Sequence, residues 1–146
     1  MSPLRMPPIG PHGDEASPSL HRSASTLSPI TMLVVEDRPE LRESLCFLLE
    51  RHGHEVLLAA SAEEGLAVLR ARSDIALLLT DIGLPGLDGW GLARQARVMY
   101  RELAVIYMSG HASAQWHTHG VSGSAFLGKP FAMDDLLAWM NALLTR

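Results

Sequence analysis

Residues 75–90 have the sequence IALLLTDIGLPGLDGW. Its first six residues are apolar apart from Thr80, which is typical of a strand that is buried on both faces of a parallel sheet. A carboxylate, Asp81, follows this run directly. The glycine- and proline-rich segment after it favours a turn that leads into a helix from about residue 90. This stretch therefore predicts a strand, an acidic side chain at its carboxyl end, and a helix.

The same alternation of strand and helix continues on both sides of this stretch. Further short apolar runs predict strands at residues 32–35, 55–59, 103–108 and 125–127. Apolar residues at helical spacing predict helices at residues 39–52, 61–72, 90–100 and 133–144. Residues 111–123 have little periodicity, so we expect a short, loosely held helix there. The alternation predicts an α/β fold: a doubly wound, five-stranded parallel sheet with helices on both faces.

The first 30 residues differ from the rest of the chain. They hold six of the nine prolines and six serines, and they show no hydrophobic period. Such a segment buries too little apolar surface to offset the entropy of ordering it, so residues 1–30 are predicted to be a disordered extension. Two explanations stay open: the segment is a functional arm, or the start codon has been assigned too early in the gene. Residues 31–146 are predicted to form one domain, since the whole chain has only 146 residues.

Composition argues against several classes of protein. The formal net charge is -4 and only 19% of residues are charged, which argues against direct binding to nucleic acid. The one cysteine, Cys46, excludes an internal disulfide and a Cys/His zinc pattern. No apolar run approaches the roughly 20 residues that span a bilayer, and the N-terminus lacks the apolar stretch of a secretion signal. We therefore expect a cytoplasmic protein without membrane insertion.

Polar side chains gather where the predicted strands end. They are Glu36 and Asp37 after the first strand, Asp81 after the third, Ser109 after the fourth and Lys129 after the fifth. In open parallel sheets, ligands bind at the carboxyl ends of the strands, where the winding direction reverses. Converging carboxylates repel one another unless a cation intervenes, and hard oxygen donors with open positions suit Mg²⁺. The hydroxyl and the ammonium group could then hold a phosphoryl group, with one carboxylate as nucleophile.

These residues, in this order, resemble those of the bacterial response-regulator receiver domain from about residue 32 to residue 146. The likeness rests on the Glu36-Asp37 pair, on Asp81, on Ser109 in VIYMSGH and on Lys129 in FLGKPF. It implies a flavodoxin-like receiver fold with strand order 2-1-3-4-5. It also implies a stand-alone, single-domain response regulator that takes a phosphoryl group from a sensor histidine kinase or a histidine phosphotransferase. The downstream protein target is unknown, and a phosphorylation-dependent homodimer is left open.

The resemblance assigns roles to the acidic residues. Asp81 is implied to be the phosphoacceptor in a Mg²⁺-dependent reaction. Asp37 is implied to bind the metal directly together with Asp81, Glu36 through water, and Gly83 through its backbone carbonyl. Such a protein is a phosphoacceptor in signalling that promotes its own phosphorylation and dephosphorylation, and is not an enzyme acting on a separate substrate.

The resemblance also implies how the signal is transmitted. Ser109 would hydrogen-bond the phosphoryl group, and Lys129 would pair with it. A cis peptide bond is expected between Lys129 and Pro130, because X-Pro bonds adopt this form far more readily than others. Phe126 matches the aromatic residue that moves inward as Ser109 shifts. The output face would comprise the helix within 111–123, the strand at 125–127 and the helix at 133–144.

Three other functions compete with this interpretation. The leading alternative is a receiver-like interaction module that is never phosphorylated. A Mg²⁺-dependent phosphatase with an aspartate nucleophile would usually have a second acid two residues later, where this chain has Gly83. A flavin-binding module would need a hydroxyl- and glycine-rich phosphate loop after the first strand. The acidic pair Glu36-Asp37 found there would repel phosphate.

Overall fold

The computed structural model describes residues 27–111 and 113–145. The strands are β1 (Thr31–Val35), β2 (Glu55–Ala59), β3 (Leu77–Asp81), β4 (Ala104–Ser109) and β5 (Ala125–Gly128). The helices are α2 (Pro39–Arg51), α3 (Ala62–Ala71), α4 (Gly89–Met99), α5 (Ser113–His119) and α6 (Met133–Leu144). The predicted disordered extension lies, as far as residue 26, outside the described residues. In the described ranges, no helix has both the length and the apolar character that a membrane crossing requires.

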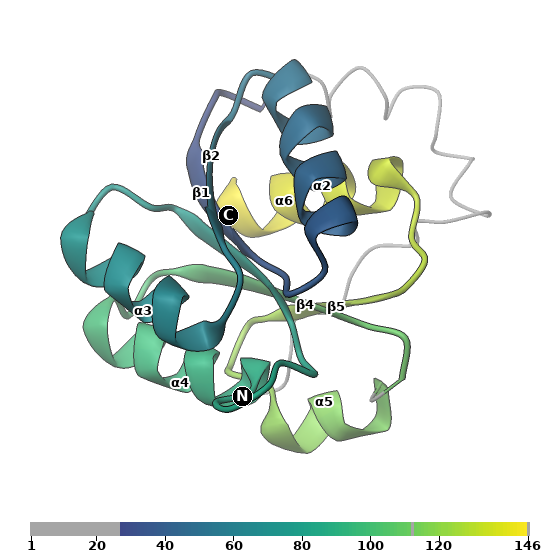
Figure 1. Cartoon of the computed structure of the whole chain (residues 1–146). Coiled ribbons are helices and arrows are strands. Elements are labelled where there is room, and N and C mark those ends of the chain that lie inside the picture. Colours follow the sequence, from purple (N-terminus) through teal and green to yellow (C-terminus); the bar gives the residue numbers. More distant parts are fainter. Residues whose placement is uncertain (1–26, 112, 146) are drawn as a thin grey trace.

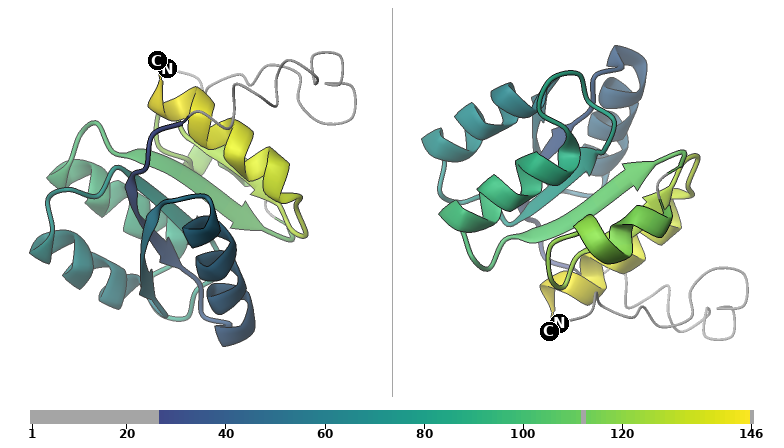
Figure 2. Two further views of the ribbon diagram at one scale, coloured as in Figure 1. Left: turned by 90° about the horizontal axis from the view of Figure 1, so that it is seen from above. Right: turned by 90° about the horizontal axis from the view of Figure 1, so that it is seen from below.

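The five strands form one sheet in the order β2-β1-β3-β4-β5 (Figure 1). Every neighbouring pair is parallel. Helices α3, α4 and α5 cover one face of the sheet, and α2 and α6 cover the other (Figures 1 and 2). The structure thus confirms the predicted fold class and strand order. Because β1 and β3 are neighbours, the segments that follow them leave the sheet side by side.

Burial on both faces explains the continuous apolar runs of the strands. Successive side chains of a strand point to opposite faces of the sheet. In β1, Leu33 and Val35 belong to the core beneath α3 and α4, while Met32 and Val34 belong to the core beneath α2 and α6. All four side chains are fully buried. Each strand therefore needs apolar residues at consecutive positions, as the sequence indicated.

Local signals in the sequence account for several helix ends. Pro39 occupies the first turn of α2, where its missing N–H is not needed. Gly53 follows that helix with a φ of 94°, a conformation that glycine adopts without strain. Ser61 caps α3 by accepting the N–H of Glu64 at 3.1 Å. The Glu64 carboxylate accepts the N–H of Ala60 at 2.6 Å, one residue earlier than in the usual capping box.

A buried histidine anchors the segment that enters β1. His54 is 6% exposed, and its Nδ1 accepts the backbone N–H of Ile30 at 3.1 Å. Ile30 also accepts the N–H of Glu55 at 2.9 Å through its carbonyl, and its side chain packs against the core beneath α2 and α6. Burial lowers the pKa of His54, and the neighbouring His52 lowers it further.

We predict that His54 makes the fold sensitive to mild acid. Its pKa in the folded state lies below the ordinary value of 6.5, so the unfolded state takes up its proton first. The free energy of unfolding should therefore fall as pH falls from 6.5 through the lowered pKa. Urea unfolding over this pH range should show a shallower fall for His54→Gln than for the wild type. His52→Gln should reduce the slope less than His54→Gln does, because His52 is the smaller of the two causes that lower the pKa of His54. Equal slopes for all three proteins would contradict the prediction.

Candidate functional site

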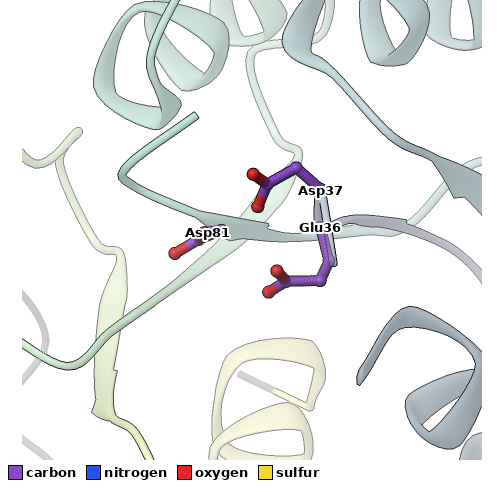
Figure 3. Close-up of side chains that lie close together, drawn as sticks. All are labelled: Glu36, Asp37 and Asp81. Carbon is purple, nitrogen blue, oxygen red and sulfur yellow. The ribbon is translucent and has the colours of Figure 1, made fainter. Parts of the chain in front are cut away.

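Three carboxylates meet at the carboxyl edge of the sheet. Asp81 is the last residue of β3, and Glu36 and Asp37 directly follow the neighbouring strand β1. One oxygen of each lies within 4.8 Å of the others, and among the described residues they form the one such acidic or metal-ligating group (Figure 3). The strand order thus brings together acids that are more than 40 positions apart in the chain.

The three acids differ in their exposure to solvent. Glu36 is fully buried, Asp81 is 8% exposed, and Asp37 is exposed. Burial is the largest influence on Glu36 and raises the pKa of its carboxyl group. Hydrogen bonds from the Lys129 ammonium and the Arg38 backbone N–H oppose this rise, whereas the charge of Asp81 adds to it. Its hydrogen-bond donors therefore offset part of the effect that burial has on the pKa of Glu36.

Lys129 places a positive charge between two of these acids. Its Nζ lies 2.8 Å from Glu36 Oε1 and 3.4 Å from Asp81 Oδ1. The residue follows β5, and its backbone N–H donates to the carbonyl of Ser109 at the end of β4. The Lys129–Pro130 peptide bond is cis, as the resemblance implied. An ammonium group held in this position offsets part of the repulsion between the carboxylates.

Ser109 and Gly83 lie at the same edge of the sheet. Ser109 ends β4 in register with Gly128, the residue before Lys129. Its hydroxyl is half-buried and accepts the N–H of His111 at 3.0 Å, so in this conformation it is engaged by the loop that follows β4. Gly83 is exposed two residues after Asp81 and lines the same cleft as that acid.

The first residue of α4 lies very close to the backbone of Asp81. A Cβ atom at Gly89 would overlap the carbonyl oxygen of Asp81, so only glycine allows the helix to begin this close to β3. The N–H of Gly89 donates to the carbonyl of Ile82 at 2.9 Å. Asp88 caps the helix by accepting the N–H of Gly91 at 2.9 Å. The glycine- and proline-rich sequence predicted a turn that leads into a helix here, but it did not indicate this close approach to the backbone of Asp81.

A cleft of about 700 Å³ opens beside the acidic group. Asp37, Asp81 and Lys129 lie at its polar end. Its apolar lining comes from helix α2, from the segment that joins β5 to α6 and from the first residue of α6: Leu41, Leu45, Leu48, Pro130, Phe131 and Met133. The site therefore combines a small charged centre with an adjoining apolar wall.

Comparison with known proteins identifies the family. The sequence model described as "Response regulator receiver domain" matches residues 32–141. The chain belongs to this family. Members of the receiver domain family are signalling phosphoacceptors of two-component systems. The matched range contains β1 apart from its first residue, β2 to β5, and all three acids described above.

Individual receiver proteins extend this comparison. The chain is 36% identical over 120 residues to "Response regulator MprA" of Mycolicibacterium vanbaalenii. The aligned residues make up 81% of this chain and 52% of the relative. The chain thus spans about half the length of the curated relatives it matches. A receiver protein from Sinorhizobium medicae is similar in structure with a TM-score of 0.76 and 31% identity, covering 82% of this chain and 97% of the other. The response regulator TrrA of Thermotoga maritima, solved in complex with Mg²⁺ and BeF, has a TM-score of 0.72 and 26% identity, covering 79% and 99%.

The donor set of this receiver domain fits a magnesium ion. Mg²⁺ prefers oxygen ligands and usually takes only one or two carboxylates, keeping water or phosphate in its other positions. Asp37 is exposed and Asp81 is partly accessible from the cleft, while Glu36 is buried and bonded to Lys129. Two carboxylates are thus accessible to a metal, and the third is already neutralised by the protein itself.

Proposed function

We propose that this receiver domain accepts a phosphoryl group on Asp81 from the phosphohistidine of a partner kinase or phosphotransfer protein. The observation that carries the proposal is the position of Asp81, at the end of β3 beside two further acids and 3.4 Å from the ammonium group of Lys129. A carboxylate is a suitable nucleophile for phosphoryl transfer where nearby positive charge stabilises the transferred group.

The proposed metal site comprises Asp37, Asp81 and the backbone carbonyl of Gly83 as direct ligands. Glu36 would contribute through water, which agrees with its complete burial and its bond to Lys129. When bound, Mg²⁺ would neutralise carboxylate charge and the charge of the phosphoryl oxygens.

The proposed reaction exchanges one bond to phosphorus for another. An oxygen of Asp81 forms a bond to phosphorus as the P–N bond of the partner's phosphohistidine breaks, and the electron pair of that bond stays on the imidazole nitrogen. The product on this chain is an acyl phosphate. Lys129 and Ser109 would each hold a phosphoryl oxygen, and for this the Ser109 hydroxyl has to leave the N–H of His111. Such positioned charges supply most of the rate in phosphoryl transfer.

The cleft beside Asp81 supports a protein as the phosphoryl donor. Its apolar wall from α2 and the β5–α6 segment begins next to the acidic group. A helix that presents a histidine could pack its apolar face there while the imidazole reaches Asp81. Because a kinase makes phosphohistidine from ATP, the proposal includes a cytoplasmic location. The output would pass through the face formed by α5, β5 and α6, with Phe126 as the moving residue.

Chemical phosphorylation tests the proposed function. The protein should form a phosphorylated species when it is incubated with Mg²⁺ and acetyl phosphate, detected as the mass of one added phosphoryl group. An acyl phosphate differs from a phosphoserine because hydroxylamine cleaves it, so treatment with hydroxylamine should remove the mass of the phosphoryl group and leave an aspartyl hydroxamate in place of the Asp81 carboxylate. If no phosphorylated species forms, the protein acts as the alternative, a receiver-like interaction module.

Magnesium alone should stabilise the protein. Binding relieves repulsion between carboxylates, and a ligand at about a hundred times its Kd adds about 2.7 kcal/mol to the free energy of unfolding. We therefore expect the melting temperature to rise by several degrees in a Mg²⁺ titration, and Asp37→Asn to lose most of this rise. Glu102→Gln is the matched control, since Glu102 is exposed and precedes β4 at the other edge of the sheet. A melting temperature that does not respond to Mg²⁺ would remove the metal from the proposal.

A further inference from the structure

The aromatic residue assigned to switching is in contact with a neighbouring helix. Phe126 lies on β5 and is half-buried. The ring of Trp116, from α5, lies 6.2 Å from the Phe126 ring between centroids, with an angle of 31° between their planes. Both residues pack against the core on the α3 and α4 face of the sheet. Any change in the position of Phe126 therefore affects its contact with Trp116.

Hydrogen bonds hold Trp116 in this position. Its indole Nε1–H donates to the Ser124 hydroxyl at 3.0 Å, and that fully buried hydroxyl donates to the carbonyl of Val121 at 2.6 Å. The N–H of Val121 in turn donates to the hydroxyl of Tyr107 on β4 at 3.0 Å. The indole thus belongs to a chain of bonds that ties α5 to the turn before β5 and to strand β4.

Gly120 allows the indole to take this position. A Cβ atom at Gly120 would overlap Cδ1 of Trp116, and the Gly120 N–H donates to the Trp116 carbonyl at 2.9 Å. Helix α5 ends directly before this glycine, and the chain turns beneath the indole toward Ser124. The backbone of the turn between α5 and β5 therefore has the conformation that the contact between Trp116 and Ser124 requires.

We propose that Trp116 is a positioning residue that holds Phe126 in the conformation of the unphosphorylated protein, through its indole hydrogen bond to Ser124. The inference rests on the proposed function of Asp81, because it concerns how phosphorylation moves Phe126. In the described conformation the Ser109 hydroxyl accepts the N–H of His111, a bond that it would have to leave in order to hold a phosphoryl oxygen. A contact that is stronger in one of two states favours that state. Weakening the Trp116 bond therefore favours the state that binds a phosphoryl group.

The affinity for a phosphoryl analogue tests this proposal. Beryllofluoride with Mg²⁺ is the probe, and binding is followed by titration calorimetry. Trp116→Phe keeps an aromatic ring but removes the N–H, and it should bind the analogue about fivefold more tightly than the wild type, which is the effect of losing one neutral hydrogen bond in the competing state. Ser124→Ala removes the acceptor while keeping the indole and should act in the same direction. Trp139→Phe is the matched control, because Trp139 packs in the other core beneath α2 and α6.

A second measurement follows Trp116 itself. The chain has three tryptophans, so its ¹H–¹⁵N spectrum should hold three indole signals, and the one absent from Trp116→Phe belongs to Trp116. This signal should shift when Mg²⁺ and beryllofluoride are added, and it should shift by more than the signal of Trp139. If wild type binds the analogue but both variants bind it equally or more weakly and the Trp116 signal stays in place, the role of Trp116 is wrong and the proposed function stands. If wild type does not bind the analogue, both are wrong.

Discussion

Asp81→Asn is expected to abolish the phosphorylated species that the wild type forms with Mg²⁺ and acetyl phosphate. The amide that replaces the carboxylate is a poor nucleophile and cannot form the acyl phosphate. Because the attacking group itself is lost, the yield should fall by at least about a hundredfold. The mass of the intact protein, measured before and after incubation with the donor, gives the fraction of phosphorylated chains directly.

Asp88→Asn provides a matched control for this loss. Asp88 belongs to the same β3–α4 segment, but it is exposed and caps α4 through Gly91. Asparagine caps helices about as well as aspartate, so this variant should fold and become phosphorylated like the wild type. Equal phosphorylation of the wild type and Asp81→Asn would show that another residue accepts the group.

The strands of this fold could be predicted because they are buried on both faces, whereas their ends could not. The apolar run from residue 75 predicted the third strand, yet β3 begins at Leu77. Ile75 is buried at 8% exposure without belonging to the strand. An apolar run indicates burial, but it does not show at which residue hydrogen bonding to the neighbouring strand begins. The same limit explains the differences of one or two residues at several other ends.

Helix α5 shows why weakly periodic segments resist prediction. The sequence indicated only a short helix somewhere within 111–123, and the structure places it at Ser113–His119. The contacts that hold it involve the Trp116 indole and the Ser124 hydroxyl, which lie outside any helical period. A hydrogen bond between side chains on either side of a turn leaves no pattern in a single sequence.

The candidate site was predictable as an edge of the sheet, but its internal pairing was not. Carboxyl ends of parallel strands share one edge, so residues that follow apolar runs could be placed together. The bond between Lys129 and Glu36 joins residues 93 positions apart. Sequence reasoning assigned the ammonium group to the phosphoryl group alone, because nothing in the sequence shows that Glu36 is the fully buried member of the acidic pair. Which oxygen a cation approaches depends on burial, and burial follows from the assembled fold.

Lys129→Met should destabilise the protein strongly. It leaves the fully buried Glu36 without the ammonium group that lies 2.8 Å from its Oε1. Removing one partner of a buried ion pair typically costs about 3–5 kcal/mol, and because the Lys129 side chain retains 18% exposure we expect the lower end of that range, about 3 kcal/mol. Urea unfolding at about pH 8 measures this loss, a pH at which ordinary carboxyl groups are ionised. Lys129→Arg keeps the charge and should lose less stability, although a planar guanidinium does not replace a compact ammonium group fully.

The pH dependence of the free energy of unfolding shows whether Lys129→Met is destabilised by the loss of the charge beside Glu36 or by the loss of packing. Lys129 lowers the pKa of Glu36 against the effect of burial, so its removal raises the pKa of Glu36 further above 4.5 in the folded state. An acid with a raised pKa in the folded state stabilises that state at low pH, and the stabilisation is lost as pH rises through the raised value. The free energy of unfolding of Lys129→Met should therefore fall more steeply than that of the wild type between about pH 5 and about pH 8. Adding Glu36→Gln removes the buried charge and should restore most of the stability and flatten this dependence, a coupling that the double-mutant cycle measures. If the single and double variants are equally unstable at both pH values, the loss comes from packing, and Glu36 does not depend on Lys129 for its charge.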